Sequence, residues 1–467
     1  MDHSSPKEFG RRQFLCDTFS VVSSFAIGGA FASLSGRIAA GDPVKAGRNL
    51  RPICDESTGL PLLRLPEGFR YQSYGWTHDP MIDGVKTPPA HDGMAVVSET
   101  DGIVSIVRNH EVNGFGPPIS LDGIPYDAKG KAGCTSLKFD TRRGEWIDSW
   151  CSLSGTVLNC AGGVTPWNSW LSCEETVMGN RSIDGESVHE FTQTHGWVFD
   201  VSPAGNKKPV PLKDMGRFSH EAIAIDRDTG YAYETEDQEQ RSGFYRFIPH
   251  EKDHLSAGGK LQMLKVPGHK ILTGHVKDGT RFEVEWVDIA NPHLGHSPNT
   301  TDNSGVFYQG HRQGGTAFAR LEGCWSGNGL IYFDATNGGL AEAGQIWTFD
   351  PKNQILELLF ESPSRTTLNM PDNLCVSPRG GLLICEDHDY GEFSEHRIHG
   401  LNQEGKLSLF AINNIQLKGE KNGFTGDFRG KEWCGASFSP DGKWLFVNIQ
   451  VPGITFAITG PWENTFL

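Results

Sequence analysis

Hydrophobic positions in this chain gather in short runs that follow a turn and end in an acidic or amide residue. Turn-forming clusters such as Asp226–Gly230 and Ser377–Gly381 precede the runs, and glycine there accepts the positive φ that hairpin turns need. Each run therefore predicts the second strand of a β-hairpin. The six runs are Ile103–Glu111, Trp170–Glu174, Tyr231–Glu236, Ile331–Asp334, Leu382–Glu386 and Trp444–Asn448.

A third strand often follows the hairpin. These runs are Ser136–Asp140, Gly196–Asp200, Phe244–Phe247 and Ile346–Asp350. Six copies of one sheet unit predict an all-β fold, closed radially as a six-bladed β-propeller with elaborated loops. A β-sandwich is the alternative, but it does not account for six similar hairpins.

The long gap between the third and fourth hairpins predicts an insertion at about residues 249–318. This segment is rich in His, Gly and Asn, and we interpret it as a lid. We expect the rest of residues 41–467 to form a single propeller domain.

Polar residues collect at one end of every predicted hairpin. A hairpin returns to the edge it left, so the start of its first strand lies beside the end of its second. In a propeller the innermost strands surround a narrow axis, so both sets converge at one mouth of the channel. The first-strand starts are Asp92, Cys160, Glu221, Glu322, Asp372–Asn373 and Glu432–Cys434. The second-strand ends are Glu111, Glu174–Glu175, Glu236–Asp237, Asp334, Glu386–Asp387 and Asn448.

Carboxylates packed that closely cannot all stay ionised without cations. Oxygen ligands in such numbers suit calcium, and a thiolate among them suits iron or zinc. For each residue alone a simpler interpretation stays open: an acid at a strand end caps a turn, and Cys160 is a buried apolar side chain. Arg320 either pairs with these carboxylates or contacts an anionic substrate.

The N-terminal run Arg11–Leu15 resembles the twin-arginine export signal. The next stretch, Thr18–Ser35, is uncharged and too rich in Ser, Gly and Ala for a stable membrane anchor. Ile38–Ala40 suits cleavage, and Ala30–Ala32 is a second candidate. We therefore predict a signal peptide at residues 1–40, the twin-arginine export machinery as a partner, and a periplasmic or secreted protein. A chance Arg-Arg pair before an apolar anchor is the alternative.

The net charge, the cysteine count and the absence of some motifs exclude several classes of function. The net charge of −15 argues against a nucleic acid as a specific partner. Nine of the ten cysteines follow the predicted signal, so an odd number leaves at least one thiol outside disulfides. The sequence has no G-x-S-x-G elbow, P-loop or G-x-G-x-x-G motif, so it gives no support to a serine nucleophile or a nucleotide site.

Several polar segments of the predicted hairpins form a recognisable set. They are Arg108–Glu111, Asn159–Gly163 with Trp167, Cys173–Glu175, Gly216–Glu221, Arg320–Gly323, Pro371–Asn373, Glu432–Gly435 and Phe438–Gly442. Together they resemble the PhoX family of alkaline phosphatases, from about residue 60 to the end of the chain. The resemblance implies twin-arginine export, a six-bladed propeller, and a site that combines two iron ions (Fe³⁺) with calcium ions (Ca²⁺) at the channel mouth.

The resemblance also implies roles for single residues. Cys160 corresponds to the iron-binding cysteine, Glu221 and Glu322 to shared metal ligands, and Arg320 to the arginine that contacts phosphate. The positions that resemble calcium ligands are Glu111, Glu175 and Asp372. The implied reaction is hydrolysis of a small-molecule phosphate monoester without a protein nucleophile, because metal ions hold the phosphate and activate the attacking oxygen.

Two alternatives stay open. A calcium-dependent propeller lactonase or esterase needs neither the cysteine ligand nor Arg320, and a non-catalytic propeller that binds a partner protein tolerates loss of the central ligands. The chain is also shorter than we expect of phosphatase members of the family, which leaves room for a changed substrate.

Overall fold

The computed structural model describes residues 49–467 except 121–124, 180, 184–185, 189–190, 206 and 389–394. The predicted signal peptide, including Arg11 and Arg12, lies outside the described residues. Residues 44–467 form one compact unit. No helix among the described residues has the length and apolar character needed to cross a membrane.

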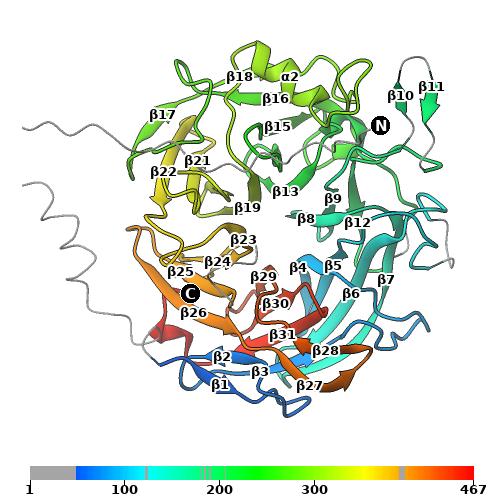
Figure 1. Ribbon diagram of the computed structural model, residues 1–467, viewed down its shortest axis with the longest axis vertical. Coiled ribbons are helices and arrows are strands. Elements are labelled where there is room, and N and C mark those ends of the chain that lie inside the picture. The colour runs from blue at the N-terminus through cyan, green and yellow to red at the C-terminus, as the bar shows by residue number, and fades with distance from the viewer. Residues whose placement is uncertain are drawn as a thin grey trace, which may run out of the picture. The chain divides into compact units, whose positions relative to one another are not determined.

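Six antiparallel sheets surround a central axis, so the predicted all-β, six-bladed propeller is confirmed (Figure 1). Blade one contains β4 (His91–Thr100), β5 (Ile103–His110), β6 (Ala132–Asp140) and β7 (Glu145–Thr156). Blade two contains β8 (Asn159–Val164), β9 (Trp170–Glu174) and β12 (Val198–Val201). Blade three contains β13 (His220–Ile225), β14 (Ala232–Glu236), β15 (Phe244–Pro249), β16 (Gly259–Lys265) and β18 (Glu285–Asp288).

The remaining blades include strands from distant parts of the chain. Blade four contains β19 (Leu321–Gly327), β20 (Leu330–Ala335), β21 (Gln345–Asp350), β22 (Ile355–Glu361) and β17 (Arg281–Glu283). Blade five contains β23 (Pro371–Val376), β24 (Leu382–Glu386), β25 (Arg397–Leu401), β26 (Leu407–Asn413), β2 (Leu63–Leu65) and β1 (Arg51–Ile53). Blade six contains β29 (Trp433–Phe438), β30 (Leu445–Ile449), β31 (Ile454–Thr459) and β3 (Arg70–Tyr74).

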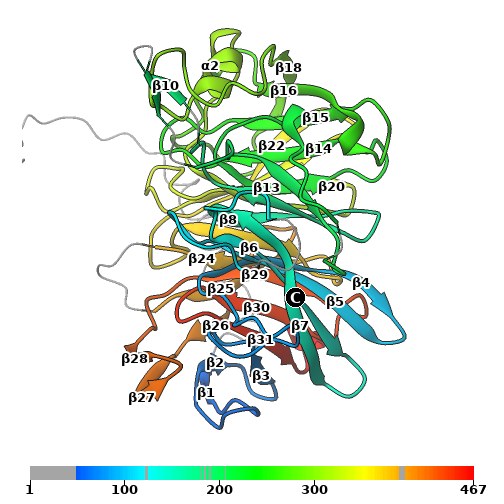
Figure 2. The same ribbon diagram turned by 90° about the vertical axis from the view of Figure 1, so that its right-hand side faces the viewer.

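Short elements complete the fold. They are the hairpins β10 (Arg181–Ile183) with β11 (Glu186–Val188) and β27 (Gln416–Lys421) with β28 (Phe424–Asp427), the helix α2 (Gly305–Arg312), and 3₁₀ turns at Lys213–Met215, Leu255–Ala257 and Trp462–Asn464. Figure 2 shows the blades from the side.

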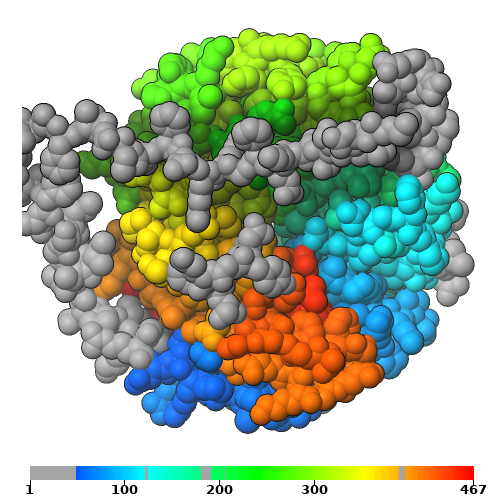
Figure 3. Space-filling view, in the orientation of Figure 1, coloured from blue at the N-terminus to red at the C-terminus, as the bar shows by residue number. Residues whose placement is uncertain are grey.

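The innermost strands explain where polar residues can converge. β4, β8, β13, β19, β23 and β29 contact one another in that order, and β29 returns to β4. β13 and β29 are buried at every position, because neighbouring blades cover both faces, whereas the outer strand β22 alternates between buried and partly exposed residues. The ring is closed by β3, which pairs with β31, so early and late segments adjoin (Figure 3).

The segment 249–318 extends two blades. Its strands β16 and β18 form the outer edge of blade three, β17 pairs with β22 of blade four, and α2 packs on β16 and β18. These elements lie at the periphery (Figure 1). The lid interpretation is therefore wrong for these elements. They add strands to the outer edges of blades three and four, which would otherwise expose unpaired backbone groups.

Candidate metal centre

Every innermost strand has a β-bulge near its first residue. In each blade two residues of the inner strand oppose a single residue of the second strand, because the register shifts there. A bulge bends the strand and re-aims a side chain, and bulges are frequent beside functional sites. What we call the inner ring contains the first bulge residues of five blades, Asp92, Cys160, Glu221, Glu322 and Asp372. Its sixth member is Cys434, which pairs with Asn448 directly before the bulge of blade six.

The inner ring converges on the axis. The Cys160 thiol lies 3.0 Å from Glu221 Oε1 and 3.7 Å from Asp92 Oδ2. These three side chains and Glu322 are buried, with 2–8% of their surface exposed. The sequence prediction that the first-strand starts meet at one place is confirmed for these residues, although what they bind stays a prediction.

A second set of residues follows the ends of the second strands. We call it the outer ring: Glu111, Glu175, Asp237, Thr336, Asp387 and Gln450. Their backbone N–H groups each donate a hydrogen bond to the carbonyl two residues before the inner-ring residue of the same blade, over 2.8–3.3 Å. All four acids are only partly buried, so the outer ring is nearer to solvent than the inner ring.

The two rings meet in two groups of potential ligands. One ligand atom each from Glu111, Cys160 and Glu175 lies within 4.8 Å of the others, and so does one each from Asp92, Glu432 and Cys434. The first group joins the cysteine implied to bind iron with two of the acids implied to bind calcium. A mixed donor set of this kind fits both a thiophilic transition metal and a hard cation.

The acids of the rings repel one another. Burial and neighbouring charges raise the pKa of Asp92 to about 7 and that of Glu175 to about 8. Burial, with repulsion from Glu322, raises the pKa of Glu221 well above its usual value, and burial does the same for Asp372. Moreover, within the described part of the chain Glu221 Oε2 has no hydrogen-bond partner, although the residue is 2% exposed. The protein itself thus leaves much of this negative charge uncompensated.

Arg320 is the cation that these acids surround. Its Nε and Nη2 donate to the two oxygens of Asp237 at 3.2 and 3.1 Å, and Nη2 also contacts Glu322. Glu322 raises the pKa of Arg320, so the guanidinium is permanently charged. Arg320 has a φ of 45°, in the left-handed region that side chains disfavour, and 25% of its side chain is exposed. The guanidinium of Arg320 is therefore held by a strained backbone and remains partly accessible.

All seven residues selected from the sequence lie in or beside the two rings. Glu111, Cys160 and Glu175 form one group, Glu221 contacts Cys160, and Arg320 contacts Glu322, whose pKa is further raised by Asp372. The selection omitted other members of the rings. They are Asp92, Asp237, Thr336, Asp387, Cys434 and Gln450, together with Glu432 next to the inner ring. Their signal was the same recurrence at hairpin ends.

The run His250–His254 has the spacing of a zinc helix, H-E-x-x-H, but a different structure. These residues lie in an exposed turn between β15 and β16, and His254 Nδ1 is 3.2 Å from Glu251. The two histidines therefore do not share a helix face, and the run is no zincin motif.

Fold and site together define a β-propeller with an axial centre of carboxylates and thiols. Residues 132–453 match the family described as Alkaline phosphatase PhoX. The chain therefore belongs to the PhoX family of alkaline phosphatases.

Comparison with curated proteins finds no match. Among solved structures, the gluconolactonase XC5397 from Xanthomonas campestris has 12% identity and a TM-score of 0.41, covering 90% of this chain and 99% of that one. A putative 6-phosphogluconolactonase from Bacteroides uniformis has 13% identity and a TM-score of 0.34, over 78% and 81% of the chains. At this level the similarity says nothing about activity.

Proposed function

We propose that this protein is an exported phosphatase that hydrolyses phosphate monoesters at an iron–calcium centre on the propeller axis. The observation that supports this most is the excess of buried, uncompensated carboxylates around Cys160 in a chain of the PhoX family. Carboxylates held this close are costly without cations, and a centre that binds several cations suits a phosphate ligand.

The residues present fit both kinds of ion. Cys160, Glu221 and Glu322 would hold iron, because a thiolate prefers a transition metal and carboxylates complete its ligand set. Glu111, Glu175 and Asp372 would hold calcium, which takes oxygen ligands only. When bound, the ions supply positive charge for the phosphate oxygens and activate the attacking oxygen.

The chain's own groups prepare the centre. Cys160 must lose its thiol proton before it ligates, and its 3.0 Å contact with Glu221 gives that proton an acceptor. Burial and the charge of Asp92 raise the pKa of Cys160 well above its usual value, so the protonated thiol is the resting form of the metal-free site. Proton release and metal uptake are therefore coupled.

Arg320 orients the substrate. Its planar fork now makes a bidentate contact with Asp237, the same geometry that a guanidinium uses with two phosphate oxygens. Calcium at the neighbouring acids would weaken the hold of Asp237 on Arg320 and free the fork for the substrate.

The test is hydrolysis of an aryl phosphate at alkaline pH by protein loaded with both metals. Cys160→Ser should remove iron and most activity while the fold remains, because a hydroxyl is a poor substitute for a thiolate. Arg320→Ala should keep the metals and lower kcat/KM by roughly 10²-fold, as loss of a charge-stabilising donor commonly does. Arg320→Lys is the matched control, because it keeps the positive charge but loses the planar guanidinium. Its kcat/KM should lie between that of the wild type and that of Arg320→Ala. Loaded wild-type protein that leaves the phosphate intact but opens a lactone would overturn the proposal.

Export is tested separately. The double substitution Arg11→Lys with Arg12→Lys should keep the precursor in the cytoplasm, because the export machinery recognises the arginine pair of the signal. Cell fractionation followed by immunoblotting measures the distribution. Normal export of the double variant would contradict the predicted route.

A further inference from the structure

The connection between the second and third strand of a blade differs strongly in length from one blade to another. Each connection begins with an outer-ring residue, so all of them lie at the end of the channel that contains the axial centre. The long connections belong to blades one and two and span residues 111–131 and 175–197. The short connections of the other four blades are residues 237–243, 336–344, 387–396 and 450–453.

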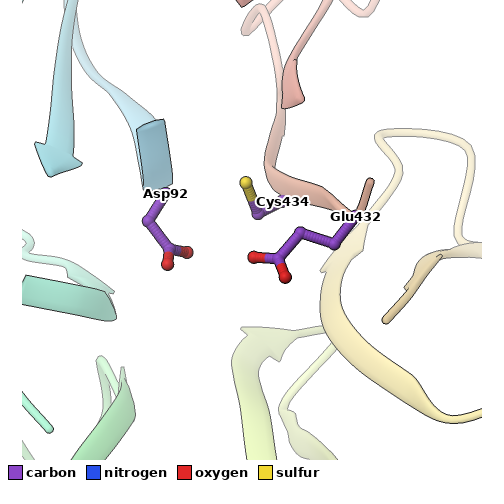
Figure 4. A group of neighbouring side chains, drawn as sticks. All are labelled: Asp92, Glu432 and Cys434. Atoms are coloured by element: carbon purple, nitrogen blue, oxygen red, sulfur yellow. The ribbon is translucent and has the colours of Figure 1, made fainter. Parts of the chain in front are cut away.

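The two long connections border one side of the axial centre. Glu111 and Glu175, their first residues, belong to the ligand group that includes Cys160. The other ligand group comes from blades six and one, and Figure 4 shows its members, with the two carboxyl groups facing each other: Asp92, Glu432 and Cys434. The long connections therefore continue outward from the group around Cys160.

Phe115 is an exposed aromatic residue in the blade-one connection. It is 55% exposed, and no other Phe, Tyr or Trp side chain in the described part of the chain is as exposed. Phe115 follows Glu111 by four residues, a stretch that spans at most about 14 Å. The exposed ring is therefore close enough to the axial centre to contact a ligand bound there.

The ring of Phe115 is held in place by both long connections. Its backbone forms an antiparallel bridge with Gly130, and the next N–H, of Gly116, donates to the carbonyl oxygen of Lys129 at 3.1 Å. The ring packs against Phe191 of the blade-two connection, with the ring centroids 4.4 Å apart. Phe191 is 2% exposed, so the pair has one buried ring and one ring that faces solvent.

Arg320 lies on the opposite side of the ring of blades. The innermost strands follow the order β4, β8, β13, β19, β23 and β29, so blade four, which begins directly after Arg320, is three blades from blade one in either direction. A guanidinium binds two oxygens of a phosphate group. A phosphate monoester bound in this way can direct its ester oxygen away from blade four, toward blades one and two.

We propose that Phe115 contacts the organic group of the substrate, and that the substrates are phosphate monoesters whose alcohol carries a flat ring. The inference rests on the proposed function for the position of the phosphate. Aromatic rings attract one another beyond their shared apolar area, and a ring that is already held in place loses little entropy on binding. Phe115 is thus a specificity-determining residue that takes no part in bond breaking.

The competing interpretation is that Phe115 only covers Phe191. Phe115→Ala removes the ring, and Phe115→Tyr restores it as the conservative variant. Ile82→Ala is the matched control, because Ile82 is 68% exposed but its N–H donates to Ser149 in the outer strand of blade one. Thermal unfolding of each variant shows whether the fold is retained, and Phe115→Leu replaces Phe115→Ala if the smaller residue unfolds the connection.

The experiment measures binding of two phosphonates, which cannot be hydrolysed, by calorimetry with the exported protein loaded with calcium and iron. Phenylphosphonate carries a ring and methylphosphonate does not. Phe115→Ala should raise the Kd of phenylphosphonate roughly 2- to 10-fold, the range expected for loss of one aromatic pair, and should leave that of methylphosphonate unchanged. Phe115→Tyr and Ile82→Ala should match the wild type for both ligands.

The outcomes separate this inference from the proposed function. If the wild type hydrolyses an aryl phosphate but Phe115→Ala binds phenylphosphonate as tightly, or loses affinity equally for both ligands, the inference is wrong and the proposed function stands. If the protein hydrolyses no phosphate ester but binds phenylphosphonate in a way that depends on Phe115, the ring contact is supported and the proposed reaction is wrong. If the wild type binds neither phosphonate, both are wrong.

Discussion

Glu174 and Glu175 are consecutive carboxylates at the end of β9, yet their surroundings are opposite. Glu174 turns into blade two, where Oε1 lies 2.6 Å from His195 Nδ1 and Oε2 accepts the backbone N–H of Gly196 at 2.8 Å. Glu175 belongs to the outer ring, where burial and repulsion from Asp237 raise its pKa to about 8. Residues of the same type, one position apart, differ in whether the protein supplies their counter-charge.

The same contrast separates Glu386 from Glu221. Burial alone would raise the pKa of Glu386, but His399 and Arg397 lower it below its usual value. Arg397 makes bonds of 2.8 and 2.7 Å to the two oxygens of Glu386. Glu221 is similarly buried, and burial with repulsion from Glu322 raises its pKa well above the usual value, because no cation of the described residues offsets them.

Burial of an acid therefore does not by itself identify a metal ligand, and these pairs differ in whether the protein compensates the negative charge. Glu174 and Glu386 inside the blades have hydrogen-bond partners for both carboxylate oxygens, as buried polar groups usually do. Among the described residues Glu221 Oε2 has no hydrogen-bond partner, and burial with neighbouring charges raises the pKa values of Glu221, Asp92 and Glu175. The instability of these acids in the metal-free protein is the reason to expect cations there.

The largest expected effect is a pH dependence of the metal-free protein. Asp92, with a pKa raised from 3.8 to about 7, and Glu175, raised from 4.5 to about 8, keep their protons in the folded state after the unfolded chain has released them. Stability should therefore fall as pH rises through these windows, by about 1.4 kcal/mol per pH unit and group.

Urea unfolding with a chelator, compared with unfolding in excess calcium and iron, measures this slope. Metals bind the ionised acids, so the slope should flatten or reverse when they are present. Equal slopes in both conditions would show that the axial acids bind no cation.

A smaller effect is expected from the compensated acid. Glu174→Ala should destabilise even the metal-free protein by roughly 3–5 kcal/mol, because it leaves His195 and the N–H of Gly196 buried without their acceptor. Chemical denaturation at neutral pH gives the free energy of unfolding. A loss well under 1 kcal/mol would mean that His195 finds enough compensation in Asp127, 3.3 Å away.

The smallest effect should have the opposite sign. Glu175→Gln removes a crowded carboxylate and should stabilise the metal-free protein by about 1 kcal/mol, while lowering its affinity for calcium. Isothermal calorimetry with calcium and urea unfolding of the same samples check both parts. If Glu175→Gln destabilises the metal-free protein as Glu174→Ala does, the two neighbours do not differ in role.

Much of the fold could be read from the sequence because each hairpin repeats one pattern. All six predicted second strands are present, as β5, β9, β14, β20, β24 and β30. The four predicted third strands correspond to β6, β12, β15 and β21. Short apolar runs between strong turn signals left few other structures open to them.

The sequence does not show which residue of an acidic pair faces the axis and which is bound inside the blade. Glu174–Glu175 and Glu386–Asp387 look alike in sequence, and only the register of the strands decides which member faces the axis. Their partners His195 and Arg397 come from other parts of the blade, so the sequence around each acid does not predict them. The bulge that contains Cys160 is likewise set by pairing between strands.

The pairing of β3 with β31 also governs the order of events during synthesis. Tyr71 pairs with Ile458, so blade six cannot form until the ribosome has made nearly the whole chain. Contacts between such distant residues form slowly, because a long loop must close first. Asp92 and Cys434 come from β4 and β29, the strands on either side of this closure. The part of the axial centre that they share is thus assembled after translation, and ions that need both residues can enter only a finished chain.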